Sequence, residues 1–138
     1  MHDSTTRLRD LYVALWNEPD AAAQRAAIEQ VFTGDAAHVL QPPEETRRRA
    51  AELRVEAAFE ARGHDALQER ARRAYEEFVA PGRYVFRPLG EPTRLRDLVT
   101  FRWQMVATED ESVAAVGREV LLLSGEGRVR LDYQIIEP

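Results

Sequence analysis

The residues best suited to acid–base chemistry lie on three strand-like runs in the C-terminal half of the chain. The runs cover residues 95–107, 113–123 and 128–136, and they supply Arg102, Glu119 and Asp132 respectively. The short turn between the last two runs predicts a hairpin in which Glu119 faces Asp132. If the preceding turn also pairs symmetrically, Arg102 lies opposite Glu119. The pattern therefore predicts a row of one guanidinium and two carboxyl groups on one face of a sheet.

Such a row has a definite chemical meaning. Two carboxyl groups on neighbouring strands lie about 5 Å apart and cannot both ionise cheaply, so the pKa of at least one should rise. A carboxyl group with a raised pKa beside an arginine is an arrangement that can donate or accept protons. We therefore take Glu119, Asp132 and Arg102 as candidate catalytic residues.

The same strands allow a second interpretation. Simple alternation would bury the more apolar face and leave the charged row in solvent, as an ion-pair ladder that contributes little to stability. The residues of that apolar face are Val120, Leu122, Val129, Leu131, Tyr133 and Ile135. The pattern alone leaves both orientations open.

Composition restricts the classes of function. The chain has 138 residues, which suits a single domain, and a net charge of −5 with both signs spread along it, which argues against a nucleic-acid partner. It contains no cysteine, and all 19 basic residues are arginine, so thiolate and lysine Schiff-base chemistry are excluded. No apolar run is long enough to span a membrane. We expect a cytoplasmic protein without a metal or a cofactor, since no metal-ligand spacing or phosphate-binding loop is present.

The periodicity of apolar residues predicts helices before strands. Helices are expected at 5–17, 20–31, from Pro42 to about 54, and 65–79, with a short strand at 37–41. A strand at 84–89 and the three runs above follow. This order predicts an α+β fold in one domain, 1–138.

Several segments resemble the nuclear transport factor 2-like superfamily, including its SnoaL-like and ketosteroid isomerase-like branches. They are residues 11–20 (LYVALWNEPD), 34–39 (GDAAHV), 63–67 (GHDAL) and 125–129 (GEGRV). The resemblance implies a cone-shaped, curved antiparallel sheet wrapped around three or four helices and enclosing a cavity. It also implies that the charged face lines the cavity, and that the apolar outer face of the sheet forms a homodimer.

The resemblance assigns expected roles to individual residues. Tyr12 lies where steroid isomerases hold an oxyanion-binding tyrosine, and Glu119 where they hold a protonated acid. The position of their general base falls on Gln41 or Leu40, neither of which accepts a proton, so the chain departs from the isomerase pattern. Compared with limonene-type epoxide hydrolases, Arg102 and Asp132 match approximately. Gln104 stands where the second acid of those enzymes is expected.

The region around the predicted cavity mouth completes the set of expected ligand contacts. Residues 42–63 form a helical lid-like insertion, from which Phe59 and Leu53 could cover a ligand. Tyr12 and Trp16 are equally compatible with structural roles, and a lone histidine such as His38 is more often structural than catalytic. The full expected ligand-binding set is Tyr12, Trp16, His38, Gln41, Phe59, Arg102, Gln104, Glu119 and Asp132.

Three functional hypotheses remain open from the sequence. The first is a cofactor-independent acid–base enzyme of the isomerase, cyclase or epoxide hydrolase type, acting on a small, largely apolar ligand, with Tyr12 donating to an oxyanion. The second is a non-catalytic metabolite-binding protein. The third is a dimerisation module whose cavity is filled by its own side chains.

Overall fold

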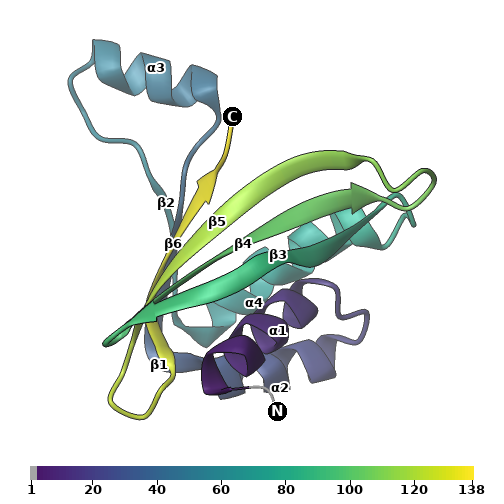
Figure 1. Ribbon diagram of the computed structural model, residues 1–138. Coiled ribbons are helices and arrows are strands. Elements are labelled where there is room, and N and C mark those ends of the chain that lie inside the picture. Colours follow the sequence, from purple (N-terminus) through teal and green to yellow (C-terminus); the bar gives the residue numbers. More distant parts are fainter. Residues whose placement is uncertain (1–2) are drawn as a thin grey trace.

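The computed structural model describes residues 3–138 and shows a curved six-stranded sheet that wraps around helices on its concave side (Figure 1). The strand order is β2-β1-β6-β5-β4-β3. The helices are α1 (Ser4–Trp16), α2 (Ala21–Val31), α3 (Glu44–Glu52) and α4 (Gly63–Ala74), which continues into a π-helical turn, η1 (Tyr75–Val79). The strands are β1 (Phe32–Leu40), β2 (Phe59–Arg62), β3 (Tyr84–Leu95), β4 (Leu98–Ala107), β5 (Val113–Leu123) and β6 (Val129–Ile136). The predicted α+β cone is confirmed.

One pairing departs from the expected antiparallel sheet. The strands β1 and β6 run parallel, with His38 beside Asp132, whereas every other neighbouring pair is antiparallel. The sheet is therefore mixed. This parallel pair brings a residue from the first third of the chain next to the C-terminal strands.

The predicted helix starts follow local capping chemistry. The Asp3 side chain accepts a hydrogen bond of 2.8 Å from the Thr6 backbone N–H, and Asp20 accepts one of 2.8 Å from that of Ala23. Each carboxylate satisfies an amide that the first turn of a helix leaves free. These caps place α1 and α2 within one residue of their predicted limits.

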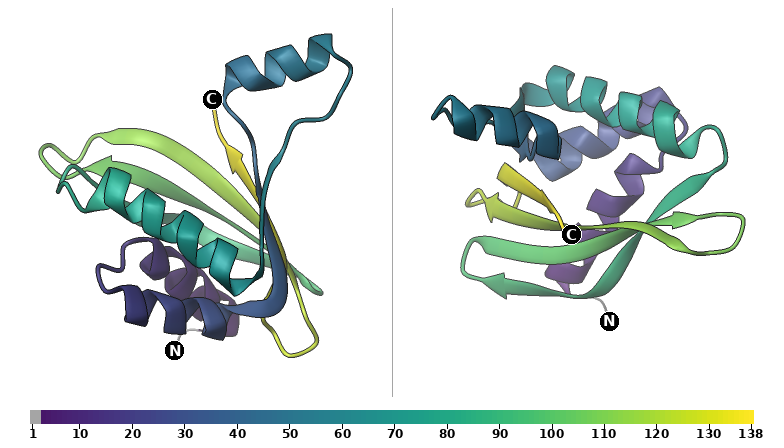
Figure 2. Two further views of the ribbon diagram at one scale, coloured as in Figure 1. Left: turned by 180° about the vertical axis from the view of Figure 1, so that it is seen from behind. Right: turned by 90° about the horizontal axis from the view of Figure 1, so that it is seen from above.

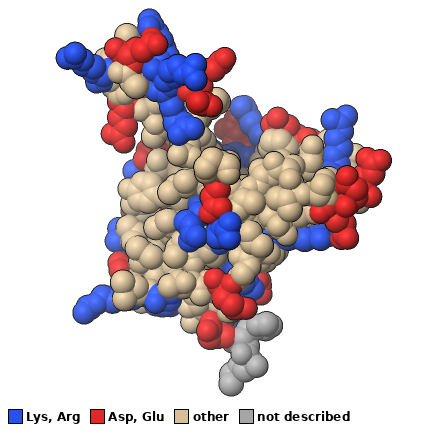
Figure 3. Space-filling model, turned by 45° about the horizontal axis from the view of Figure 1, so that its top comes forward, with Lys and Arg blue, Asp and Glu red and all other residues tan. Residues whose placement is uncertain are grey.

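The strand β2 was not predicted, because residues 42–63 were assigned to a helical lid-like insertion. In the structure they pair antiparallel with β1, and Phe59 lies opposite Leu40. The segment between the two strands carries α3, which projects from the sheet as an arm (Figures 1 and 2). Charged side chains gather on this arm, while the body beneath it is largely uncharged on the face shown in Figure 3.

The predicted register is wrong in two places, with different consequences. Glu119 pairs with Gln134 and not with Asp132, a shift of two residues that keeps both acids on the same face. Arg102 pairs with Arg118 and not with Glu119, a shift of one residue that turns Arg102 to the opposite face. In each hairpin the ladder contains an irregularity near the turn, which local symmetry could not predict.

The core lies between the helices and the concave face of the sheet. Its largest fully buried side chains include Tyr12, Phe32 and Phe101. Gly117 in β5 lies directly beneath the Trp103 ring, which occupies the space that a Cβ would need. The absent side chain at Gly117 therefore lets Trp103 lie flat against the sheet. Within residues 3–138 no helix combines the length and apolar character needed to cross a bilayer.

Candidate functional site

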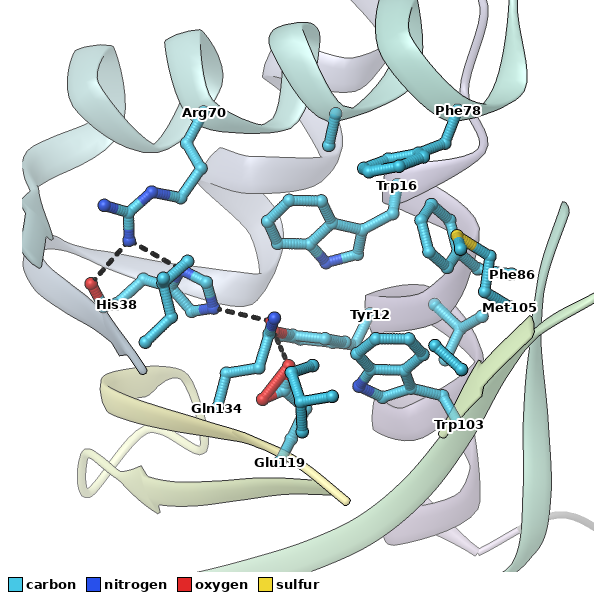
Figure 4. Close-up of a pocket in the computed structure, with 15 residues that line it drawn as sticks. Tyr12, Trp16, His38, Arg70, Phe78, Phe86, Trp103, Met105, Glu119 and Gln134 are labelled. Atoms are coloured by element: carbon cyan, nitrogen blue, oxygen red, sulfur yellow. Dashed lines mark hydrogen bonds between the residues drawn. The ribbon is translucent and has the colours of Figure 1, made fainter. Parts of the chain in front are cut away.

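A cavity of about 320 Å³ lies between the helices and the concave face of the sheet. Aromatic side chains form much of its wall, among them Trp16 from α1, Phe78 from η1, Phe86 from β3 and Trp103 from β4. The polar residues that line it are Tyr12, His38, Arg70, Glu119 and Gln134 (Figure 4).

The Tyr12 hydroxyl bridges the two buried acids. Its oxygen lies 2.8 Å from Glu119 Oε1 and 2.6 Å from Asp132 Oδ2. Glu119 and Asp132 are both completely buried, and Tyr12 is 1% exposed. The ring is held by edge-on packing against Phe101, with centroids 5.3 Å apart.

The hydrogen count of this cluster requires an extra proton. A phenol has one O–H, so it can donate to only one of two carboxyl groups. If both acids were ionised, one short oxygen–oxygen contact would hold two acceptors and no hydrogen. One carboxyl group is therefore protonated, as expected for two acids that share a buried site.

The surroundings favour Glu119 as the protonated acid. Burial raises its pKa well above the usual range, and the negative charge of Asp132 raises it further. Burial also raises the pKa of Asp132, but the nearby His38 and Arg70 act in the opposite direction there, whereas the hydroxyl of Tyr12 lowers the pKa of both acids. Burial and the two acids raise the pKa of Tyr12 well above its normal value, so Tyr12 stays neutral.

His38 extends the cluster toward α4. Its Nε2 lies 3.1 Å from Gln134 Oε1 and 3.6 Å from Asp132 Oδ2. On the other side of the ring, Arg70 Nη1 lies 3.0 Å from Nδ1 and donates to the His38 carbonyl oxygen at 2.9 Å. Burial lowers the pKa of His38, and together with Arg70 it outweighs the opposing charge of Asp132, so the imidazole is neutral at physiological pH.

By distance alone, His38, Glu119 and Asp132 could hold a metal ion, because one donor atom from each lies within 4.8 Å of the others. The hydrogen-bond pattern opposes this use. Arg70 has only N–H donors, so His38 Nδ1 must be the acceptor and Nε2 must carry the proton of the neutral ring. The nitrogen that faces the two acids is thus already protonated.

The structure brings together five of the residues predicted from the sequence: Tyr12, Trp16, His38, Glu119 and Asp132. The first four line the cavity, and Asp132 lies behind Tyr12. Whether these residues bind a ligand stays a prediction.

Four other predicted contacts lie outside the cavity wall. Arg102 is on the outer face of the sheet, where its Nε and Nη2 donate to Glu137 at 3.0 and 2.7 Å. Gln104, two residues further along β4, shares that face. Gln41 Oε1 accepts from the Ile136 backbone N–H at 3.0 Å, and Phe59 is 45% exposed.

Arg70 and Gln134 are cavity-lining residues that sequence reasoning missed. For Gln134 a signal existed, since it lies two residues after Asp132 and so shares its face of β6. Arg70 has no comparable signal, because it is one of many arginines on a polar helix.

The insertion at 42–63 does not cover the cavity in this structure. Leu53 and Val55 are more than half exposed, and neither lines the cavity. Its action as a lid stays a prediction, which hydrogen exchange of its amides with and without ligand would test.

No protein-family model matches the chain, and no curated protein is similar to it in sequence. Solved structures share its fold. A candidate isomerase of the SnoaL-like family from Agrobacterium tumefaciens superposes with a TM-score of 0.77 at 20% identity, covering 97% of both chains. An NTF2-like protein of unknown function from an Exiguobacterium species gives 0.64 at 18% identity, covering 94% of this chain and 98% of that one. A candidate polyketide cyclase from Sinorhizobium meliloti gives 0.60 at 16% identity, covering 93% of both. The resemblance seen in the sequence is thereby confirmed at the level of the fold.

Proposed function

We propose that this NTF2-like chain binds a small, largely apolar molecule in its cavity and acts on it by acid–base chemistry without a cofactor, with Glu119 as the proton donor. The observation that carries the proposal is the single Tyr12 hydroxyl shared by two buried carboxyl groups. An arrangement that keeps a carboxyl group protonated at neutral pH supplies an acid where an ordinary glutamate would supply only a base.

Access distinguishes the two acids. Glu119 is the only carboxyl group among the residues that line the cavity. One oxygen of each acid, Glu119 Oε2 and Asp132 Oδ1, has no hydrogen-bond partner among residues 3–138, but only that of Glu119 belongs to a cavity-lining residue. A buried acceptor without a partner is costly, and an O–H or N–H group of a ligand would satisfy it. Asp132 does not line the cavity and keeps the negative charge behind Tyr12.

The charge balance supports the same assignment. Arg70 is the only arginine among the residues that line the cavity, and its charge lowers the pKa of Asp132. One cation next to two acids favours one ionised and one protonated carboxyl group. The aromatic wall suits the apolar body of a ligand, and the cavity is of the size that ligand sites usually have. The solved structures described as a candidate isomerase and a candidate cyclase agree with this class of chemistry.

A non-catalytic binding protein is the second candidate, and one observation favours it. No cavity-lining residue is free to accept a proton from a ligand. Glu119 is already protonated, and the Nδ1 lone pair of His38 accepts a hydrogen bond from Arg70. Binding without turnover of any compound would support this alternative.

Intrinsic fluorescence gives a direct test of ligand binding. The only two tryptophans, Trp16 and Trp103, both line the cavity, so an occupant should change their emission. We expect 2-decalone, a compact apolar ketone, to change the emission with saturation. Ala74→Phe, which fills the cavity from α4, should weaken binding at least tenfold, whereas Ala80→Phe at an exposed position should not. Saturable binding unaffected by Ala74→Phe would place the ligand elsewhere.

The outer face of the sheet supports a proposed homodimer. Tyr133 and Ile135 in β6 are 43% and 41% exposed, beside the half-buried Val120, Leu122 and Leu131. A contiguous apolar patch of this kind is commonly an interface. We expect a dimer in sedimentation equilibrium and a shift toward monomer in Ile135→Glu. A wild-type protein that is monomeric at high micromolar concentration would contradict the proposal.

A further inference from the structure

Gln134 is placed to contact the same ligand as Glu119. The two residues are directly opposite each other in the β5–β6 ladder, and both line the cavity. Side chains at such paired positions lie close enough to touch a common third group. Figure 4 shows Gln134 rising between His38 and Glu119.

The two ends of the Gln134 amide are in different situations. Its Oε1 lies 3.1 Å from His38 Nε2, whereas its Nε2 has no hydrogen-bond partner within the described part of the chain. An amide end that carries two N–H donors is therefore available at the cavity wall.

The orientation of that amide follows from a chain of obligatory donors. Arg70 can only donate, and its Nη1 lies 3.0 Å from His38 Nδ1, so Nδ1 must accept. A neutral His38 then carries its proton on Nε2 and donates it. The group facing Nε2 must in turn accept, which requires the oxygen of Gln134 there and leaves its NH₂ for the cavity.

We infer that the Gln134 amide NH₂ is a ligand-binding donor beside Glu119, and that Arg70 orients it through His38. The inference rests on the proposed function, because it concerns the same cavity. Arg70 is a positioning residue, since it acts on Gln134 only through the imidazole.

The free donor of Gln134 specifies a ligand class. A carbonyl oxygen has two lone pairs and can accept from the Gln134 NH₂, whereas a hydrocarbon leaves this donor unpaired. A carboxylate would place a second negative charge near Asp132 in a buried site, which is unfavourable. The cavity thus selects an uncharged carbonyl compound with an apolar body.

The first test needs no ligand. Histidine ¹⁵N chemical shifts of the wild-type protein should show His38 as the neutral tautomer with the proton on Nε2. In Arg70→Met the Nδ1 nitrogen is released, so the ¹⁵N shifts of His38 should change, while Arg72→Met, a half-buried arginine on the same helix, should leave them unchanged. A proton on Nδ1 in the wild type would overturn the inference, because Gln134 would then have to turn its NH₂ toward His38.

The second test compares two probes of the same shape by tryptophan fluorescence, 2-decalone and the hydrocarbon 2-methylenedecalin. The wild type should prefer the ketone, and Gln134→Met should reduce this preference about tenfold while changing hydrocarbon binding less than about twofold. Gln104→Met is the matched control. Gln104 lies in β4 on the outer face of the sheet, away from the cavity, so this variant should leave the preference intact.

The outcomes separate the inference from the function on which it rests. If the ketone preference survives Gln134→Met but is lost in Glu119→Gln, the role of Gln134 is overturned and the proposed function stands. Equal binding of both probes to the wild type also overturns the inference but leaves an apolar pocket. If neither probe binds, the proposed function and the inference both fall.

Discussion

Replacing Glu119 with glutamine is expected to flatten the pH dependence of stability above pH 4.5 and to abolish any turnover. Burial raises the pKa of Glu119 above its unfolded value of 4.5. Its contribution to stability is therefore fully present below pH 4.5 and is lost as pH rises through the raised folded pKa. The wild type should lose up to about 1.4 kcal/mol per pH unit between pH 4.5 and the folded pKa of Glu119. In that range the unfolded state has released the proton that the folded state still holds. Glutamine has no proton to release, and its NH₂ can donate to Asp132, so the fold should survive.

His38 determines where this slope can be measured. Burial lowers its pKa below the unfolded value of 6.5, so its effect has the opposite sign and stability falls as pH drops below 6.5. Urea unfolding of the wild type and of Glu119→Gln between about pH 5 and pH 9 removes that overlap, because His38 contributes to both proteins. Glu137→Gln is the control, because the pKa of this outer-face carboxylate is lowered by Arg102 and it stays ionised throughout the range. The same pH dependence in the wild type and in Glu119→Gln over this range would contradict a raised pKa for Glu119.

Tyr12→Phe is expected to destabilise the protein by about 3 kcal/mol, because it removes the only hydroxyl shared by the two buried acids. The phenyl ring retains the packing against Phe101 and Trp16. The loss is therefore electrostatic: Asp132 keeps its charge but loses the donor that helps to lower its pKa. Its pKa should rise further, and the acid pair should become easier to protonate.

Urea unfolding at neutral pH measures this effect. Tyr133→Phe is the matched control, since Tyr133 is 43% exposed on the outer face and its hydroxyl can bond to water, so the change should stay within about 0.5 kcal/mol. Equal stability of the two variants would show that the Tyr12 hydroxyl is not needed to satisfy the acids, and that their proton is shared in another way.

The sequence alone determined those helix and strand limits that depend on residues close by in the chain. Asp3 and Asp20 mark helix starts because a cap acts within one turn, and β5 was predicted at its observed limits because its turns are local signals. Glu119 and Asp132 share a face because side chains alternate along each strand, and an even error in register does not alter that.

The composition of the site was decided by tertiary structure. A one-residue difference in the β4–β5 register moved Arg102 from the cavity to the outer face, and the ladder irregularity that causes it depends on how the whole sheet curves. Residues 59–62, which were predicted to be part of a helical insertion, pair with β1 as a strand, a contact that their local sequence did not indicate.

Arg70 shows most clearly where local reasoning stops. Its position on α4 was predictable, but its approach to His38 joins residues 32 positions apart through the packing of α4 against the sheet. The sequence by itself determined which side chains could hold a proton and on which strand face the two acids lie, because those properties are intrinsic or periodic. Only the tertiary structure decided which of them meet, because contacts between distant segments depend on register, curvature and packing that no local pattern encodes.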